Sequence, residues 1–254
     1  MLMIFTLERV WWIDMKLEFL GTRGNIDART RRHRMHSSLM VSYYGKHIMV
    51  DCGEDWLGNL SDLQLNAMLI THAHPDHVWG LKKGAPCPVF APQEVWEEIE
   101  DYPIQETRRI EHRRAIEVEG IDFEAFPVDH STLAPAVGYR ITDVRMTILY
   151  VPDVVYIPDR DEALQEAQIY VGDGATITRS MVTKPGDELI GHTPVRTQLT
   201  WCQKEGVPKA IITHCGSEIV KGDERVLRSK IRELAHERGV EAEIAYDGME
   251  VVLR

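Results

Sequence analysis

Cysteine is scarce in this chain of 254 residues, and its four copies lie far apart. Cys52, Cys87, Cys202 and Cys215 form no CxxC pair, so the sequence predicts neither a structural zinc knuckle nor a disulfide framework. Cysteines used so sparsely are typical of a reducing compartment, and we expect a cytoplasmic protein.

Long apolar runs, linkers and repeats are also missing. The apolar start of the chain, before Met15, is too short to span a membrane, and its three charged residues also argue against a span. We treat residues 1–14 as an extension, either not native or an extra strand, with Val10 to Ile13 as a candidate surface for a homodimer or for packing. Residues 15–254 are expected to form a single domain.

Positive charge is in deficit, because 29 lysines and arginines face 40 acidic residues and give a net charge of -11. This balance argues against general binding to nucleic acid or to an anionic membrane. One basic run, Arg29 to His36, stands out. Its Arg31, Arg32 and Arg34 are either a solvated loop or contacts to a substrate phosphate, which the guanidinium fork suits well.

Alternating strand-like and helix-like segments predict an α/β architecture. Among them we expect a strand over Lys16 to Leu20, a helix over Trp56 to Leu65 and a helix opening at His192. A last hairpin is expected over residues 244–253, around Asp247-Gly248. Side chains that can bind metals follow several separate strands, and such residues meet beyond the carboxyl ends of a sheet. They are Asp51, His72, His74, His130, Asp153 and His214.

The densest group of such residues is His72-Ala73-His74-Pro75-Asp76-His77. Alternation in an extended segment puts His72 and His74 on the same side. Pro75 suits the first position of a helix, so Asp76 and His77 would lie in its first turn. Imidazole and carboxylate are common ligands of zinc, manganese and iron. The sequence therefore predicts a metal site here, the alternative being a polar loop that is rich in histidine.

This stretch resembles the HxHxDH signature of the metallo-β-lactamase superfamily, and the resemblance extends from about Met15 to Arg254. It implies an αββα sandwich, in which two mixed β-sheets face each other with helices on the outer faces. It also implies two divalent metal ions, for which zinc and manganese are expected and iron would fit as well.

The resemblance assigns seven metal ligands. His72, His74 and His130 match the ligands of a first ion, whereas Asp76, His77 and His214 match those of a second. Asp153 matches the carboxylate that bridges the two ions. Asp51 would support the metal loop or orient a ligand histidine from behind.

The reaction class is also suggested by resemblance. His74 stands where the flavo-diiron branch usually has glutamate, which favours hydrolysis over redox chemistry. His192 matches an extra histidine of the phosphodiesterase branch, which includes ribonuclease Z and the phosphonate-pathway cyclic phosphodiesterases. In that role, His192 would protonate a leaving alkoxide. The alternative is that His192 lies near the start of a helix and has no catalytic role. His192 and Asp76 are the catalytic candidates.

Spacing limits the substrate. Asp153 follows His130 by 23 residues, too few for the transfer RNA arm that ribonuclease Z commonly inserts there. With the acidic charge, this makes transfer RNA an unexpected partner. We expect a small-molecule phosphodiester, cyclic ones included, or a nucleotide, although the cysteine-rich zinc site of the cyclic phosphodiesterases is missing. The alternatives are a hydrolase of a lactone, thioester or β-lactam, and a non-catalytic metal-binding protein.

Overall fold

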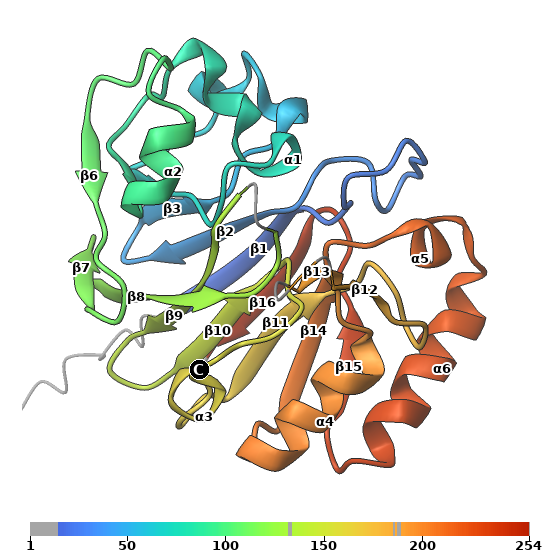
Figure 1. Ribbon diagram of the computed structural model, residues 1–254. Coiled ribbons are helices and arrows are strands. Elements are labelled where there is room, and N and C mark those ends of the chain that lie inside the picture. Colours follow the sequence, from blue (N-terminus) through green and yellow to red (C-terminus); the bar gives the residue numbers. More distant parts are fainter. Residues whose placement is uncertain (1–14, 132–133, 185, 187–188, 254) are drawn as a thin grey trace, which may run out of the picture.

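Two seven-stranded sheets lie face to face in the computed structural model, which describes residues 15–131, 134–184, 186 and 189–253 (Figure 1). The first sheet has the order β16-β1-β2-β3-β4-β5-β6, with β1 Met15–Gly21, β2 Ser38–Tyr43, β3 Lys46–Val50, β4 Ala67–Leu69, β5 Val89–Ala91, β6 Thr107–Arg109 and β16 Met249–Leu253. The second has the order β15-β14-β11-β10-β9-β8-β7, with β7 Ile116–Val118, β8 Ile121–Val128, β9 Ala136–Thr142, β10 Thr147–Val151, β11 Ile169–Asp173, β14 Lys209–Thr213 and β15 Glu241–Ile244. A separate two-stranded ribbon pairs β12 Met181–Thr183 with β13 Ile190–His192.

Helices cover the outer face of each sheet. On the first sheet, α1 Pro75–Val78 and α2 Gln93–Glu98 belong to a core cluster with buried Met49 and Met68 (Figure 1). On the second, the covering helices are α3 Arg160–Ala163, α4 Val195–Glu205, α5 Ser217–Lys221 and α6 Glu224–His236. The four layers confirm the αββα sandwich that the resemblance implied.

The core between the sheets follows from side-chain alternation along the strands. In β1, Met15, Leu17 and Phe19 are buried and the residues between them are partly exposed. In β10 all five residues are buried, because Ile148 and Tyr150 face the inter-sheet core and the alternate residues face the helices. This explains why residues 148–151 form a continuous apolar run, whereas Lys16 to Leu20 alternates.

The helix predicted over Trp56 to Leu65 is wrong. One short 3-10 turn, Glu54–Trp56, ends at the first residue of this segment, and a second, Leu60–Asp62, lies within it. Gly58 lies between them with a φ of 84°, a conformation that glycine adopts at little cost and that interrupts a right-handed helix.

The predicted last hairpin is also wrong, although its turn exists. β15 pairs with β14 in the second sheet, whereas β16 pairs with β1 in the first, so the chain crosses between sheets at Asp247-Gly248. The crossing is held by distant residues: the Asp247 carboxylate accepts hydrogen bonds from the Thr22 hydroxyl (2.7 Å) and the Arg34 amide (2.7 Å). An Asp-Gly pair predicts a turn but not the partner of each flanking strand.

The helix expected to open at His192 begins three residues later. α4 starts at Val195, and Pro194 precedes it in an extended conformation. His192 instead ends β13, where it pairs with Met181 of β12. The histidine is therefore held by a strand of the ribbon rather than by the first turn of a helix.

Among the described residues, no helix is both long enough and apolar enough to cross a bilayer. The extension over residues 1–14, with the proposed dimer or packing surface at Val10 to Ile13, lies outside the described residues.

Acid is expected to destabilise the β1–β2 connection through two buried histidines. Burial, followed by the charge of a nearby arginine, lowers the pKa of His33 and of His36 to about 4. Between pH 6.5 and 4 the unfolded chain therefore binds more protons, so the free energy of unfolding falls as the pH drops through this window, by roughly 3 kcal/mol for each histidine. Urea unfolding of chelator-treated protein at pH 7 and pH 4.5 measures the loss. His33→Gln should flatten the pH dependence, and an unchanged slope in this variant would contradict the assignment.

Candidate metal centre

The predicted metal ligands converge at one end of the sandwich, where strands from both sheets finish. β4 leads into the loop that carries His72 and His74. On the second sheet, β8, β10 and β14 end one or two residues before His130, Asp153 and His214. Strands that run in the same direction thus deliver side chains from distant parts of the sequence to a common edge.

The metal loop takes its shape from Pro75. His74 is extended, with a ψ of 150°, and Pro75 opens the single turn of α1. Asp76 and His77 lie in that turn and are buried. Gly53 makes this packing possible, because a Cβ atom there would come within 2.1 Å of the Asp76 carbonyl oxygen.

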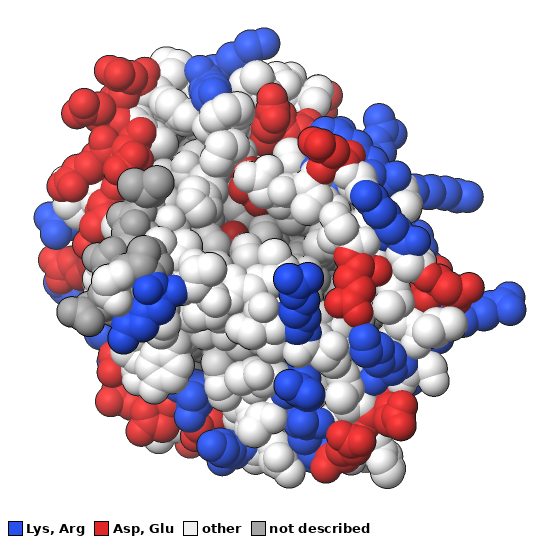
Figure 2. All heavy atoms as spheres, turned by 45° about the vertical axis from the view of Figure 1, so that its right-hand side comes forward, with Lys and Arg blue, Asp and Glu red and all other residues white. Residues whose placement is uncertain are grey.

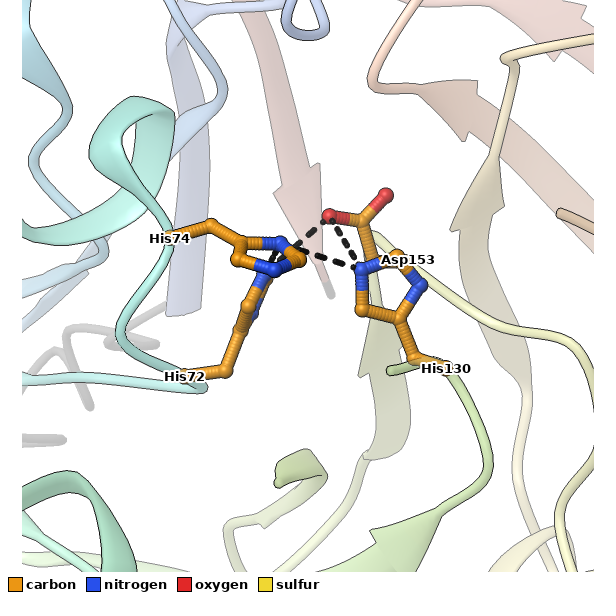
Figure 3. A group of neighbouring side chains, drawn as sticks. All are labelled: His72, His74, His130 and Asp153. Atoms are coloured by element: carbon orange, nitrogen blue, oxygen red, sulfur yellow. Dashed lines mark hydrogen bonds and ion pairs between the residues drawn. The ribbon is translucent and has the colours of Figure 1, made fainter. Parts of the chain in front are cut away.

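A first group of ligand atoms comes from both halves of the chain (Figure 3). Nδ1 of His74 lies 3.0 Å from Nε2 of His72 and 3.2 Å from Nε2 of His130. Oδ2 of Asp153 lies 3.3 Å from Nε2 of His72 and 3.7 Å from Nε2 of His130. Figure 3 shows the three rings and the carboxylate turned toward a common point.

A second group shares Asp153 with the first. It contains Asp76, His77 and His214, all buried. Nε2 of His77 lies 3.0 Å from Oδ2 of Asp153, and Nδ1 of His214 lies 2.8 Å from Oδ1 of the same carboxylate. Nε2 of His214 lies 3.1 Å from Oδ2 of Asp76. The structure therefore brings together all seven predicted ligands, with Asp153 between the two groups.

Unsatisfied polar atoms show that the donor set fits metal cations. Four of its buried atoms have no hydrogen-bond partner: Oδ1 of Asp76, Nε2 of His77, Oδ1 of Asp153 and Nδ1 of His214. Some of these atoms approach one another, but none is aligned for a hydrogen bond. Buried polar atoms without partners are costly, and such a concentration at one point is explained by a bound ion.

The buried negative charge also indicates that this site binds metal cations. Asp51, Asp76, Asp153 and Asp173 are each at most 3% exposed and lie in and around the two groups. Buried carboxylates require compensating positive charge, and the only arginine or lysine among the described residues that line the central pocket is the exposed Arg179. The His and Asp clusters thus indicate binding of divalent metal.

The protonation states differ between the two groups. Burial lowers the pKa of His72 well below its usual value and that of His74 to about 4, so these imidazoles keep a lone pair free at neutral pH. Burial also lowers the pKa of His77 and His214, but the charges of Asp76 and Asp153 outweigh it and raise both pKa values well above the usual range. The second group therefore attracts positive charge strongly, either as protons or as a cation.

Asp51 lies behind the ligands. Its Oδ2 atom is 2.9 Å from Nδ1 of His77, and its Oδ1 atom accepts hydrogen bonds from the backbone amide (2.8 Å) and hydroxyl (3.0 Å) of Thr71. The residue is fully buried and has a φ of 64°, which is strained for a non-glycine residue. Asp51 thus connects His77, a predicted ligand, with Thr71 at the start of the predicted metal loop.

His192 is held next to the predicted metal ligands by a residue that the sequence analysis did not select. Its Nδ1 atom lies 2.8 Å from Oδ2 of Asp173 and 3.4 Å from Oδ1 of Asp153. Burial lowers the pKa of His192, but the charge and hydrogen bond of Asp173 outweigh it and raise the pKa above its usual value. Asp173 is the last residue of β11. The sequence pattern that could have found it, a carboxylate at the end of a buried strand, is the pattern that selected Asp51 and Asp153.

Six of the residues described above line a pocket of about 430 Å³: His74, Asp76, His130, Asp153, His192 and His214. The face turned forward in Figure 2 is hollowed near its centre, and acidic atoms are visible inside the hollow. Beyond the ligands, the wall includes Thr176 and Arg179, both missed by the sequence analysis. The Thr176 hydroxyl donates to the Arg179 carbonyl (2.7 Å), which fixes the turn that carries the arginine.

The three arginines proposed as phosphate contacts do not line this pocket. Arg31 and Arg32 lie in the wall of a second pocket, and the Arg34 amide donates to Asp247. The cause is again the crossing at Asp247, which anchors the β1–β2 connection and lets Arg32 stack on the Tyr246 ring, 3.8 Å from its centroid. This placement gives no support to a role in binding substrate at the metal centre.

Comparison with known proteins identifies the family. The sequence profile described as "Beta-lactamase superfamily domain" matches residues 46–215, which is more than half of the chain. A ribonuclease Z from Methanococcus maripaludis (strain C5) is 29% identical over 158 residues, and the match covers 52% of this chain and 49% of that protein. The chain spans about half the length of this relative and of several similar ones.

Solved structures agree on the fold. The metallo-β-lactamase fold protein YhfI from Bacillus subtilis has a TM-score of 0.74 at 16% identity, with 94% of this chain and 99% of that chain covered. A structure described as a new diphosphatase from the PhnP family has a TM-score of 0.70 at 19% identity, covering 93% and 97% of the two chains. With the profile match and the geometry of the His and Asp groups, these similarities show that the chain belongs to the beta-lactamase superfamily and has the metallo-β-lactamase fold.

Proposed function

We propose that the protein is a hydrolase with two divalent metal ions that cleaves a small phosphodiester, cyclic ones included, or a nucleotide. The observation that carries the proposal is the Asp173–His192 pair, held 3.4 Å from the carboxylate that the two ligand groups share. A proton donor beside the metals is needed when the leaving group is an alkoxide, which is a poor leaving group in water.

The proposed ion sites follow the two ligand groups. His72, His74 and His130 would hold one ion, Asp76, His77 and His214 the other, and Asp153 would contact both. Divalent ions there, zinc or manganese and with iron also suited, would supply Lewis-acid chemistry, which lowers the pKa of water and neutralises charge on phosphate oxygens. Asp51 orients His77 through Nδ1, so that Nε2 faces the ion site.

His192 would act as the general acid. Its Nδ1 atom is engaged by Asp173, which leaves Nε2 as the nitrogen that can give a proton to the substrate in the pocket. Asp173 would keep the ring in this orientation and favour its protonated form. Arg179 at the pocket wall would bind an anionic oxygen of the substrate.

A small substrate is the more specific part of the proposal. The name ribonuclease Z indicates that those relatives act on RNA. In this chain the described residues between His130 and Asp153 form only β9 and β10 and no extended arm. We therefore propose that transfer RNA is not the substrate. The four cysteines are free thiols, in keeping with the proposed cytoplasmic location.

Metal-dependent turnover tests the reaction class. Protein stripped with a chelator and refilled separately with zinc and manganese is expected to hydrolyse a chromogenic phosphodiester only after refilling. Assays in parallel would use a chromogenic carbonyl ester and a precursor transfer RNA. If protein shown to hold two ions cleaves only the ester, the phosphodiesterase proposal fails; if it cleaves the precursor transfer RNA best, the proposed small substrate fails.

A further inference from the structure

A second pocket lies beside the metal centre and shares none of its lining residues. It has a volume of about 240 Å³ and is bounded by the β1–β2 connection, the end of α5, the first turns of α6 and the end of β15. This volume is below the roughly 300–1,000 Å³ typical of pockets for drug-sized ligands, so an occupant would be small.

The rim of this pocket is strongly cationic in an acidic protein. Three arginines, Arg31, Arg32 and Arg228, face one glutamate, Glu224, which leaves a formal charge of +2 on the rim. His33 adds no charge at neutral pH, because burial lowers its pKa to about 4.

The guanidinium groups have donors to spare. Arg32 and Arg228 approach the same oxygen, Oε1 of Glu224, at 3.4 Å and 3.3 Å, and neither contact is a hydrogen bond. Arg31 has no ion pair or side-chain hydrogen bond with any residue that the structure describes. Ion pairs that are this long and partly exposed are weak, so they compete poorly with an incoming anion.

The floor is apolar and the rim is fixed in place. Ile219, Val220 and Leu227 are each at most 7% exposed and belong to the core under the pocket. Arg32 is positioned by its stacking on Tyr246. His33 is anchored by Nδ1, 2.8 Å from the Thr22 hydroxyl.

We propose that this second pocket binds a small organic phosphate monoester, with the dianion on the three arginines and the apolar body on the floor. A phosphate monoester matches the rim charge of +2, and its oxygens accept the parallel N–H donors of guanidinium groups. Arg31 and Arg32, from the middle of the basic run that stands out in the sequence, thus serve a site that is separate from the metal centre and does not depend on the proposed hydrolase activity.

Calorimetric titration with phenyl phosphate tests the site in the full-length chain. The measurement is made with metal-loaded and with chelator-stripped protein, because stripping removes binding at the metal centre but should leave the second pocket intact. Arg228→Glu is expected to weaken the remaining binding at least about tenfold, since it takes the rim charge from +2 to 0. Arg232→Glu is the matched control: it lies one turn further along α6, outside the pocket, changes the net charge equally and should alter the affinity less than about twofold.

Two further ligands separate the parts of the proposal. Benzoate, which keeps the ring but carries a single charge, and inorganic phosphate, which lacks the ring, should each bind at least about fivefold more weakly than phenyl phosphate. Loss of all binding on metal stripping, or equal affinity in Arg228→Glu and Arg232→Glu proteins of equal helix content, would overturn the site. Equal affinity for phenyl phosphate and inorganic phosphate would overturn the organic ligand.

Discussion

Asp153→Ala is expected to lose at least one metal ion per chain and more than about 100-fold in hydrolytic rate. Asp153 is the one carboxylate that belongs to both ligand groups, with Oδ2 3.3 Å from Nε2 of His72 and 3.0 Å from Nε2 of His77. Replacing groups that only support metal ligands costs roughly 10–100-fold in affinity or activity, so the loss of a shared ligand should exceed that range. Elemental analysis after gel filtration measures metal content, and turnover of a chromogenic phosphodiester measures the rate.

Asp122→Asn provides the control for this experiment. Asp122 is exposed on β8, away from the ligand groups, and the variant removes one carboxylate charge without touching the metal centre. Its metal content and rate should equal those of the unmodified protein. An Asp153→Ala protein that folds, retains its full metal content and hydrolyses normally would rule out the shared-ligand assignment.

His192→Ala is expected to reduce cleavage of an alkyl phosphodiester by about 10²–10⁴-fold, the range typical of general acid catalysis. The reason is that an alkoxide needs a proton as it leaves, whereas p-nitrophenolate does not. The same variant should therefore cleave a p-nitrophenyl phosphodiester, or an activated carbonyl ester, within about tenfold of the unmodified rate. His236→Ala, at the exposed end of α6, is the matched histidine control.

The pH profile gives an independent measure of the same role. The charge of Asp173 raises the pKa of His192 above its usual value in spite of burial, so the rate should fall as pH rises through that pKa and the acid loses its proton. Asp173→Asn removes the carboxylate and should move this fall to lower pH. A similar loss for alkyl and nitrophenyl substrates in His192→Ala, with no change of profile in Asp173→Asn, would leave His192 with a structural role only.

The residues that we propose as metal ligands could be selected from the sequence because local order along the chain constrains them. His72, His74, Asp76 and His77 are close in the chain, and an extended segment followed by a proline-initiated turn brings them to one side. His130, Asp153 and His214 each follow an apolar strand, and strands of one direction end at one edge. The αββα layering itself came from the family resemblance, since periodicity predicts strands and helices but not how sheets stack.

The predictions from sequence that were wrong concern segments whose structure depends mainly on contacts with distant residues. Residues 244–253 have the local pattern of a hairpin, yet Asp247 binds Thr22 and Arg34, and its two flanking strands join different sheets. The same contacts hold the basic run in place and carry Arg31 and Arg32 to the second pocket. Trp56 to Leu65 has helix-forming residues, but Gly58 interrupts it with a positive φ.

Sequence alone thus determined which side chains could bind metal, their order along the chain and the strands that precede them, because these depend on residue type and on neighbours a few positions away. Tertiary structure decided that Asp173 holds His192, that Arg179 lines the pocket at the metal centre and that Arg31 and Arg32 line a separate one. The Asp173–His192 pair and the separate second pocket depend on contacts between residues far apart in the chain, such as Asp247 with Thr22, and only the folded chain creates such contacts.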